Sequence, residues 1–342
     1  MYFSGTDDQR LLYINNRLMN RHTYCEFNYQ IMGPIMDTRG LEQGGIYSSD
    51  AYKIYNNEQA YSSHQSLLGA SIYDECISSI SLADDCALIS DSLVNLKNLL
   101  QINTKFCEKA DVELVPEKTH LMMFSPDLSG AIDPGELSHL FLNGNDIPFS
   151  SEADHLGVLC ASSAFNMPNL VKRFSAHRRK LYSLLPTGMA LRHGASPSSS
   201  LKVERLFALP VLLSGLGALV LTKCEINALH VHYKNTLRSL LKLPKDVPDP
   251  AIFFLAGSLP VEAYLHMRVL SLFSMICHLK DNPLHSIAKS ALICARPSSR
   301  SWFFMLRKIC IMYNLPHPIN LLTSPLPRTR FKLLYKSRVL EY

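Results

Sequence analysis

Residues 79–90, SISLADDCALIS, decide how this chain is interpreted. Two adjacent aspartates, Asp84 and Asp85, interrupt an apolar run that is typical of a buried strand. Burying an unpaired carboxylate is costly, and two neighbouring carboxylates also repel each other. The pair therefore either faces water at a tight turn or holds a cation. In both cases the run predicts two short strands joined at the aspartates, with the acidic pair at the tip of the hairpin.

Length and composition limit the kinds of protein this chain can be. Its 342 residues are 47% hydrophobic, which is enough apolar surface for the cores of two or three domains. Its 9 cysteines form no C-x-x-C pair, and none stands at zinc-ligand spacing with histidines. Scattered free thiols without a signal peptide indicate a reducing compartment inside the cell, nuclear or cytoplasmic, and argue against a structural zinc.

One uncharged run, LFALPVLLSGLGALVLT at 206–222, bears on the question of a membrane. A helix that spans a bilayer needs about 20 apolar residues, and this run is shorter and interrupted by Pro210, Gly215 and Gly217. We therefore expect a buried pair of helices and no transmembrane helix. A membrane-associated helical protein is the alternative that this run leaves open.

Charge is divided unevenly along the chain. Residues 1–169 carry 9 Lys and Arg against 22 Asp and Glu, a balance of −13. Residues 170–342 carry 25 against 7, a balance of +18, so the halves together give the net charge of +5. Either the halves neutralise each other across a domain interface, or a cation-holding site stands beside a surface for polyanions.

Patterns in the first half predict an α+β arrangement. Ser48-Ser49-Asp50 and Asp91-Ser92 are expected N-caps of two helices, the second reaching about residue 110. Residues 112–124 read as a strand, a turn at Pro116 and a second strand. Asn143-Gly144 predicts a hairpin turn. Residues 155–159 are expected to complete an antiparallel sheet with packed helices.

From Asn166 onward the pattern becomes helical almost throughout. In NLVKRFSAHRRKLYSLL, residues 169–185, four apolar residues define a packed side: Leu170, Phe174, Leu181 and Leu184. The other positions carry Lys172, Arg173, His177, Arg178, Arg179 and Lys180. A charge run is usually a solvated helix face, but residues 170–245 hold 13 Lys and Arg against 2 acidic residues. This imbalance favours contact with phosphates. His230 and His232 are expected on a helix surface.

Four motifs follow one another in a fixed order: Arg39-Gly40-x-x-Gln43-Gly44-Gly45, Ala83-Asp84-Asp85, Glu117-Lys118-Thr119 and Leu156-Gly157. Their order and spacing resemble the palm of a reverse transcriptase of the LINE-type non-LTR retrotransposons. The resemblance covers residues 8–160, and the remainder fits the thumb and downstream region by composition and position only. It implies a partial palm at 1–160, a basic helical thumb-like region at 161–246 and a C-terminal helical region at 247–342.

This resemblance implies two-metal nucleotidyl transfer, in which carboxylates hold Mg²⁺ ions near the attacking 3′-oxygen and the leaving pyrophosphate. Asp84 would be a metal ligand and Asp85 a supporting one, and two Mg²⁺ ions would act in a complete enzyme. Lys118 would lie near the triphosphate, as an electrostatic or acid group. For each motif a plainer interpretation exists, namely a solvated turn for the aspartates and a solvated lysine for Lys118.

The resemblance also implies contacts with substrates. Gly44 and Gly45 would let the backbone approach a base or sugar closely, and Gln43 would bond near the incoming nucleotide or template. The alternative for this segment is a glycine turn ahead of a helix. Leu156 and Gly157 would form the primer grip. The implied partners are an RNA template, a DNA primer, their RNA–DNA hybrid, and dNTPs, bound in part by Lys172, Arg173, Arg178, Arg179 and Lys180.

One part of the family pattern has no match in this sequence. The palm of the family carries a further catalytic aspartate on a strand upstream of the Gln-Gly motif, and Asp7 and Asp8 fit a helix cap better than that role. The expected function is therefore a reverse transcriptase fragment that is inactive by itself. The alternative is a non-catalytic nucleic-acid-binding relic of such an element.

Overall fold

The computed structural model describes residues 9, 12–13, 15–16, 21–37, 40–41, 45–124, 140–142, 144–161, 166–188, 195–294 and 301–342. The chain divides into two units. We call the first the mixed unit (Met1–Ile72, Cys76–Thr119 and Gly135–Ile147) and the second the helical unit (Tyr73–Glu75, His120–Pro134 and Pro148–Tyr342). Helices and antiparallel strands occur together, as an α+β fold requires.

All of the described strands pair as two-stranded antiparallel hairpins. Their bounds are β1 Arg21–Phe27 with β2 Gln30–Asp37, β3 Ala70–Ile72 with β4 Glu75–Ile77, β5 Ser79–Leu82 with β6 Asp85–Leu88, β7 Phe141–Leu142 with β8 Asn145–Asp146, and β9 Glu152–His155 with β10 Val158–Ala161. Within the described residues these hairpins do not join into the larger sheet expected for a palm. An isolated two-stranded hairpin is only marginally stable, and β5–β6 and β10 pack on neighbouring helices.

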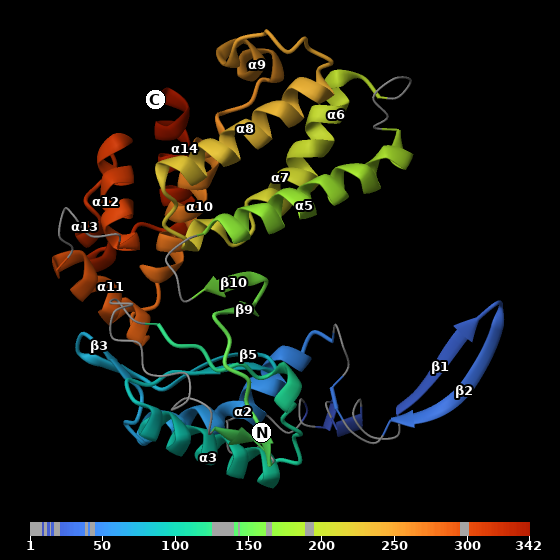
Figure 1. The fold of residues 1–342 in the computed structure, drawn as a ribbon, viewed down its shortest axis with the longest axis vertical. Coiled ribbons are helices and arrows are strands. Elements are labelled where there is room, and N and C mark those ends of the chain that lie inside the picture. Colours follow the sequence, from blue (N-terminus) through green and yellow to red (C-terminus); the bar gives the residue numbers. More distant parts are fainter. Residues whose placement is uncertain are drawn as a thin grey trace. The chain divides into compact units, whose positions relative to one another are not determined.

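Two helices, α2 (Ser48–Gln65) and α3 (Leu93–Lys109), form the centre of the mixed unit and pack on each other and on the hairpin β5–β6 (Figure 1). The predicted cap of α3 is confirmed, since the Ser92 hydroxyl accepts the backbone N–H of Asn95 at 3.2 Å. Leu99 and Cys107 are buried on the packed side of α3. An ion pair, Lys109 to Glu58 at 2.6 Å, ties the two helices together at the surface.

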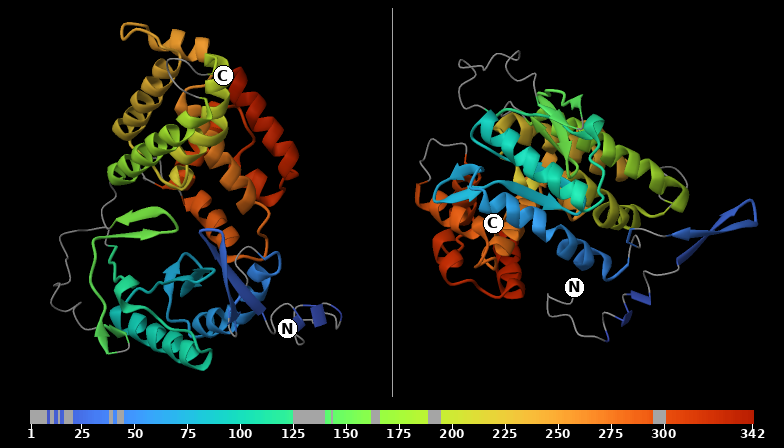
Figure 2. Two further views of the ribbon diagram at one scale, coloured as in Figure 1. Left: turned by 90° about the vertical axis from the view of Figure 1, so that its right-hand side faces the viewer. Right: turned by 90° about the horizontal axis from the view of Figure 1, so that it is seen from below.

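The hairpin β1–β2 projects away from α2 and α3 (Figures 1 and 2). Both of its faces are exposed and carry large apolar side chains: Tyr24, Phe27, Tyr29, Ile31, Met32, Ile35 and Met36. Later in the chain, the hairpin predicted at Asn143-Gly144 forms between β7 and β8. Gly144 has the positive φ, +79°, that such a turn requires.

The strands predicted at 112–124 are not formed. The structure has a 3₁₀ turn, η2 (Pro116–Lys118), and an isolated parallel bridge between Leu121 and Phe149. Proline at 116 starts the 3₁₀ turn and lacks the N–H that a strand ladder needs. The β-branched and apolar residues around it were a weak signal, because strand formation depends on a partner strand.

The helical unit is built from short and long helices whose bounds are α5 Met167–Leu184, η4 Leu185–Thr187, α6 Pro197–Val203, the π-helix η5 Glu204–Ala208, α7 Leu209–Leu212, η6 Leu216–Ala218, α8 Lys223–Leu240, α9 Asp249–Ala256, α10 Val261–Ile276, α11 Pro283–Cys294, α12 Trp302–Met312, α13 Pro318–Thr323 and α14 Arg328–Glu341. A first core lies among α5 to α9 and a second among α10 to α14. Helix α10 contributes to both, through Val261 and Leu265 to the first and through Val269 and Phe273 to the second.

The uncharged run at 206–222 lies in the first of these cores. It forms the end of η5, α7 and η6, and Gly215 reverses the chain with a φ of +75°. Leu212 and Leu216 are almost completely buried there. Leu206 and Phe207 are exposed, so the run is buried only in part, from Ala208 onward, and short helices with a π-helical turn replace the expected helix pair. No helix within the described ranges has the length and apolar character needed to cross a bilayer.

Candidate functional site

The acidic pair lies at the tip of the β5–β6 hairpin, as predicted. Leu82 and Asp85 form the last strand pair, and Ala83 and Asp84 make a two-residue turn. Ala83 has a positive φ of 52°, the backbone conformation that tight hairpin turns demand. The side chains of both aspartates are exposed. The local turn geometry thus presents two adjacent carboxylates to solvent.

The strands that flank the pair are not buried, so this part of the prediction is wrong. Ile80 is 52% exposed and Leu82 is 59% exposed. The hairpin has no neighbouring strand within the described residues, and it lies on helices at one side only. The aspartates therefore do not face the desolvation cost that a core strand would impose.

Helix α2 lies against this hairpin. The side-chain amide of Gln59 donates to the Cys86 sulfur at 3.3 Å. Burial, and after it the carboxylate of Asp84, raises the pKa of the Tyr52 hydroxyl above its ordinary value. Helix α2 begins three residues after Gly45, whose carbonyl accepts the N–H of Ser48 at 3.1 Å. The helix that follows the glycine motif is therefore placed beside the acidic tip.

Two of the predicted substrate-binding residues, Gln43 and Gly44, cannot be located. Gly45 is described, but Gln43 and Gly44 lie outside the described residues. Lys118 closes the 3₁₀ turn η2 with an exposed side chain, and its backbone N–H donates to the Val115 carbonyl at 3.2 Å. No described contact joins Lys118 to the aspartates. The structure therefore neither supports nor opposes the predicted role of Lys118 near a triphosphate.

Leu156 and Gly157 form the turn between β9 and β10, which belongs to the helical unit. Their φ values are +51° and +75°. A two-residue turn with both central residues at positive φ favours glycine, which gives a local physical reason for Gly157. The Gly157 carbonyl accepts a hydrogen bond from the guanidinium of Arg173 in α5. The turn is thus held against the basic helix.

Two of the predicted nucleic-acid-binding residues make contacts within the protein. Lys172 forms an ion pair with Asp154 of β9, and Arg173 is bonded to Gly157. Both side chains are partly exposed, so their outer edges stay accessible. Arg178 and Arg179 are exposed, while the Lys180 ammonium lies 5.9 Å from the centroid of the Phe207 ring. The fully exposed cations of α5 are therefore Arg178 and Arg179, with the partly exposed Lys180 beside them.

His177 is not on the surface, contrary to the prediction, and His232 is only partly exposed. His177 is completely buried, and its Nδ1 lies 3.0 Å from Nε2 of His232. The His232 ring stacks on Phe174 with centroids 4.2 Å apart. The charged residues around His177 gave no sign of this burial. The available signal was helical periodicity, because His177 follows Leu170 by seven residues and Phe174 by three and so lies on their side of the helix.

The imbalance of charge at 170–245 becomes sharper in three dimensions. Its 2 acidic residues are Glu204 and Glu225, and both are 0% exposed. Among the described residues of this stretch, the charged side chains that reach the surface are therefore all positive. Lys172 and Lys234 are offset by Asp154 and Asp249, which lie outside the stretch. Arg205 and Arg238 donate to backbone carbonyls. The exposed cations among the described residues of the stretch are Arg178, Arg179, Lys202, Lys223, Lys242 and Lys245.

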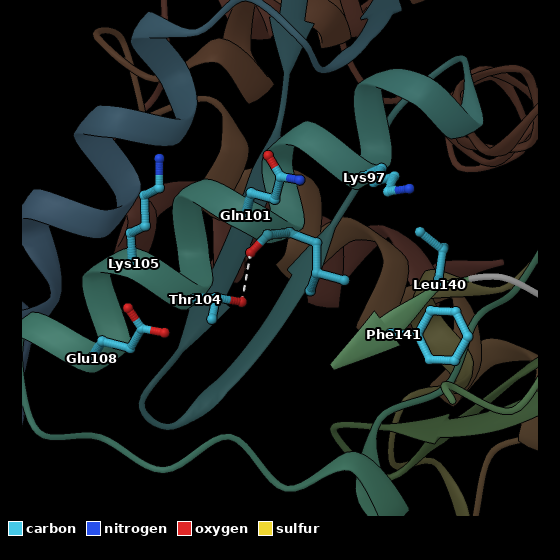
Figure 3. A pocket seen from close by; sticks show the side chains of 8 residues that line it. Lys97, Gln101, Thr104, Lys105, Glu108, Leu140 and Phe141 are labelled. Carbon is cyan, nitrogen blue, oxygen red and sulfur yellow. Dashed lines mark hydrogen bonds between the residues drawn. The ribbon is translucent and has the colours of Figure 1, made fainter. Parts of the chain in front are cut away.

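Two surface hollows occur among the described residues. One, of about 320 Å³, lies between α3 and β7 in the mixed unit, where Thr104 donates to the Leu100 carbonyl at 2.9 Å (Figure 3). The other, of about 630 Å³, lies among α9, α10 and α14 and is largely apolar. None of the residues predicted for the site lines either hollow.

Comparison with known proteins adds no relative. The chain matches no family model, and no curated protein matches it. Within the part of the chain that the structure describes, no three His, Cys, Asp or Glu side chains gather in a group that could hold a metal ion.

Proposed function

We propose that this chain is a polymerase-type protein, with a partial palm followed by a nucleic-acid-binding thumb. More particularly, we propose the reverse transcriptase fragment of a LINE-type non-LTR retrotransposon, acting on an RNA template, a DNA primer and dNTPs. In this proposal residues 1–342 are inactive by themselves and need a further catalytic carboxylate. The order of the four motifs and the arrangement of the acidic hairpin support it.

One observation carries the catalytic part of the proposal. The Asp84-Asp85 pair stands on an exposed tight turn, and this hairpin packs on the helix that begins just after Gly45. The packing of α2 stabilises the hairpin, and it also places the helix that follows the glycine motif beside the acidic tip. A nucleotide site needs both: carboxylates for metal, and a nearby segment that can approach a base or sugar.

The aspartates fit a hard cation. Mg²⁺ prefers carboxylate oxygens and usually keeps several of its waters. Both side chains are exposed, and no hydrogen bond or ion pair of either appears among the described contacts. Asp84 would hold the ion and Asp85 would support it. When bound, Mg²⁺ supplies charge stabilisation at the oxygens of the transferring phosphoryl group.

A second observation carries the binding part. Because Glu204 and Glu225 are buried, the surface of residues 170–245 presents cations without acidic residues of the same stretch. Cations that contact phosphates release counterions from a duplex and bind with little regard to base sequence. We assign this contact to Arg178, Arg179 and Lys180, with the outer edges of Lys172 and Arg173 beside them.

Titration of a labelled RNA–DNA hybrid at several salt concentrations tests the proposal. Affinity should fall steeply with salt, and replacing Arg178, Arg179 and Lys180 together by alanine should flatten the log–log slope by about two to three units. A matched control replaces three exposed lysines on the part of the chain that forms the second core by alanine. These are Lys280, Lys289 and Lys308, and their replacement should leave the slope unchanged. Equal slopes for the two triple variants would refute the assignment.

A non-catalytic nucleic-acid-binding relic is the second candidate. The observation that favours it is that the basic surface is built entirely from contacts within the helical unit. Binding of hybrid would then persist in a protein whose aspartates have no function. Activity measurements on the Asp84 and Asp85 variants, described below, separate the two candidates.

A further inference from the structure

Two glutamates in the first helical core have the same burial and opposite surroundings. Glu204 and Glu225 are both 0% exposed. In Glu225, Oε1 accepts the backbone N–H of Asn166 at 2.7 Å and Oε2 accepts that of Thr222 at 2.7 Å. Both carboxylate oxygens thus have an N–H donor, and the residue lies in the first turn of α8, at the favourable end of the helix dipole. Glu225 is therefore satisfied as an anion.

Glu204, at the start of the π-helix η5, has no such donors. Neither of its carboxylate oxygens has a hydrogen-bond partner. The nearest cationic candidate is the imidazole of His177, whose Nε2 lies 3.6 Å from Oε1 and is also without a hydrogen bond. His177 is 0% exposed as well. An ionised carboxylate without hydrogen bonds beside a neutral imidazole would be strongly unfavourable at this buried position.

The other ionisable groups around the pair do not supply a compensating charge. Arg205 follows Glu204 in η5, but its guanidinium donates to the Ala256 carbonyl and forms no ion pair with Glu204 among the described contacts. From α8, Tyr233 faces Glu204, and burial followed by that carboxylate raises the pKa of its hydroxyl. Tyr264 of α10 interacts with Tyr233, and Arg178 of α5 with His232.

His232 fixes how the proton is arranged. Burial, then His177 and Arg178, lowers the pKa of His232 to about 4, so its ring is neutral near pH 7. Its Nε2 is 3.0 Å from Nδ1 of His177, and in a neutral His232 that nitrogen can accept the Nδ1 proton. The second nitrogen of His177 then faces Glu204. An imidazolium with a carboxylate, or an imidazole with a carboxylic acid, both make the pair neutral.

We propose that the helical unit takes up one proton when it folds, that His177 and Glu204 hold this proton between them, and that the unit is thereby sensitive to pH. In the unfolded chain above about pH 6.5, the glutamate is ionised and the histidine is neutral. The folded pair holds one proton more. By linkage, stability then falls as pH rises above this value, and the unfolding constant grows by about tenfold per pH unit.

The position of the pair makes this sensitivity structural. His177 lies on α5, Glu204 on η5 and His232 on α8, so the cluster joins three elements of the first core. Loss of the proton leaves a buried negative charge at their meeting point. Alkaline solution therefore loosens the packing of α5, which carries Arg178 and Arg179.

Urea unfolding of the full chain between pH 6.5 and 8 tests this directly. The single tryptophan, Trp302, lies in the helical unit and donates to the Gly217 carbonyl at 2.8 Å, so its fluorescence reports the unfolding of this unit. The ratio of the wild-type unfolding constant to that of Glu204→Gln, whose side chain cannot ionise, should rise about tenfold for each pH unit. Contributions from cysteines are common to both proteins and cancel.

The control is Glu225→Gln, which removes an equally buried glutamate that is already satisfied as an anion. It should lower stability and keep the wild-type dependence on pH. If Glu204→Gln does not fold, Glu204→Met fills the same space without polar atoms and should give the same flattening. Parallel pH dependence in the wild type and the Glu204 variants would overturn the proposal, as would a flattening produced by Glu225→Gln.

Discussion

The side-chain amide of Asn169 makes two hydrogen bonds to the backbone of Leu159. Its Oδ1 accepts the Leu159 N–H at 2.8 Å and its Nδ2 donates to the Leu159 carbonyl at 2.7 Å. Asn169 lies in the first turns of α5 and is 4% exposed. The amide thus bonds to the backbone of β10 as a second neighbouring strand would. It fixes the hairpin that carries Leu156 and Gly157 on the basic helix.

Replacing Asn169 by alanine should destabilise the helical unit by about 2 to 3 kcal/mol, because it leaves a part-buried N–H and carbonyl of Leu159 without partners. Urea unfolding followed by Trp302 fluorescence measures this change. Asn227→Ala provides the control, since Asn227 is an exposed residue of α8 and its replacement should alter stability by less than about 0.5 kcal/mol. Equal effects of the two substitutions would contradict the anchoring role.

Acid should also weaken the helical unit, through His232. Its pKa is lowered to about 4 in the folded state, below the ordinary value of 6.5, so the unfolded chain takes up the proton first as pH falls. The stability that His232 contributes is complete above about pH 6.5 and is lost as pH falls towards 4. We expect a loss of about 2 kcal/mol, less than full linkage implies because the ring is partly exposed.

The measurement is urea unfolding at pH 6.5, 5.5 and 4.5. His232→Gln keeps a hydrogen-bonding side chain without a titrating ring, and it should lose less stability over this interval than the wild type. His285→Gln on α11 removes a histidine from the other core and should behave as the wild type does. An unchanged acid dependence in His232→Gln would show that other groups are responsible.

Primer extension by residues 1–342 alone should be undetectable. Two-metal nucleotidyl transfer needs more carboxylates than Asp84 and Asp85, and no other motif of this sequence matches the further catalytic aspartate of the family. Sites whose members act together lose most of their activity when one is missing. Extension of a labelled primer on an RNA template, with Asp84→Asn as the inactive reference, decides the matter. Extension above that reference would overturn the expectation of an incomplete site.

In a polymerase completed by a segment that supplies the further catalytic aspartate, substitutions at Asp84 and Asp85 should reduce the extension rate by different factors. Asp84→Asn should reduce extension on the order of 10³-fold or more, because it removes a direct metal ligand. Asp85→Asn should reduce it by roughly 10- to 100-fold, as is typical of a supporting group. Steady-state extension rates at saturating Mg²⁺ measure both.

Asp74→Asn serves as the control for these substitutions. Tyr73-Asp74 turns the hairpin β3–β4 as Ala83-Asp84 turns β5–β6, and Tyr73 has a similar φ of +56°. Asp74 is exposed like Asp84. Its replacement should leave the rate unchanged. Near-full activity of both Asp84→Asn and Asp85→Asn would show that the pair is a solvated turn without a metal. It would favour the non-catalytic nucleic-acid-binding relic.

Local features of the fold were predictable because neighbouring residues produce them. The hairpin at Ala83-Asp84, the Ser92 cap and the apolar side of α5 each depend on a few consecutive residues whose turn, capping or periodicity has a known physical cause. The order of candidate site residues along the chain is a property of the same kind. So is the excess of positive charge after residue 170.

The strands expected at 112–124 failed for a different reason. A strand is stable only with a partner, and partners come from distant parts of the chain, which no local pattern specifies. The exposure of Ile80 and Leu82 has the same origin, since an apolar strand is buried only when something covers it. Periodicity predicts which side of an element can be buried, not whether that side is covered.

By itself, the sequence determined the acidic turn, the basic helix and the segments that become helices. Only the tertiary structure decided what each polar side chain meets. His177 and Arg178 are neighbours in the chain, yet one is enclosed beside Glu204 and the other is exposed. Glu204 and Glu225 are the same residue with equal burial, and only one has donors. Burial and ionic state depend on groups that the chain brings together from distant positions, because desolvation and Coulomb energy act through space and not along the backbone.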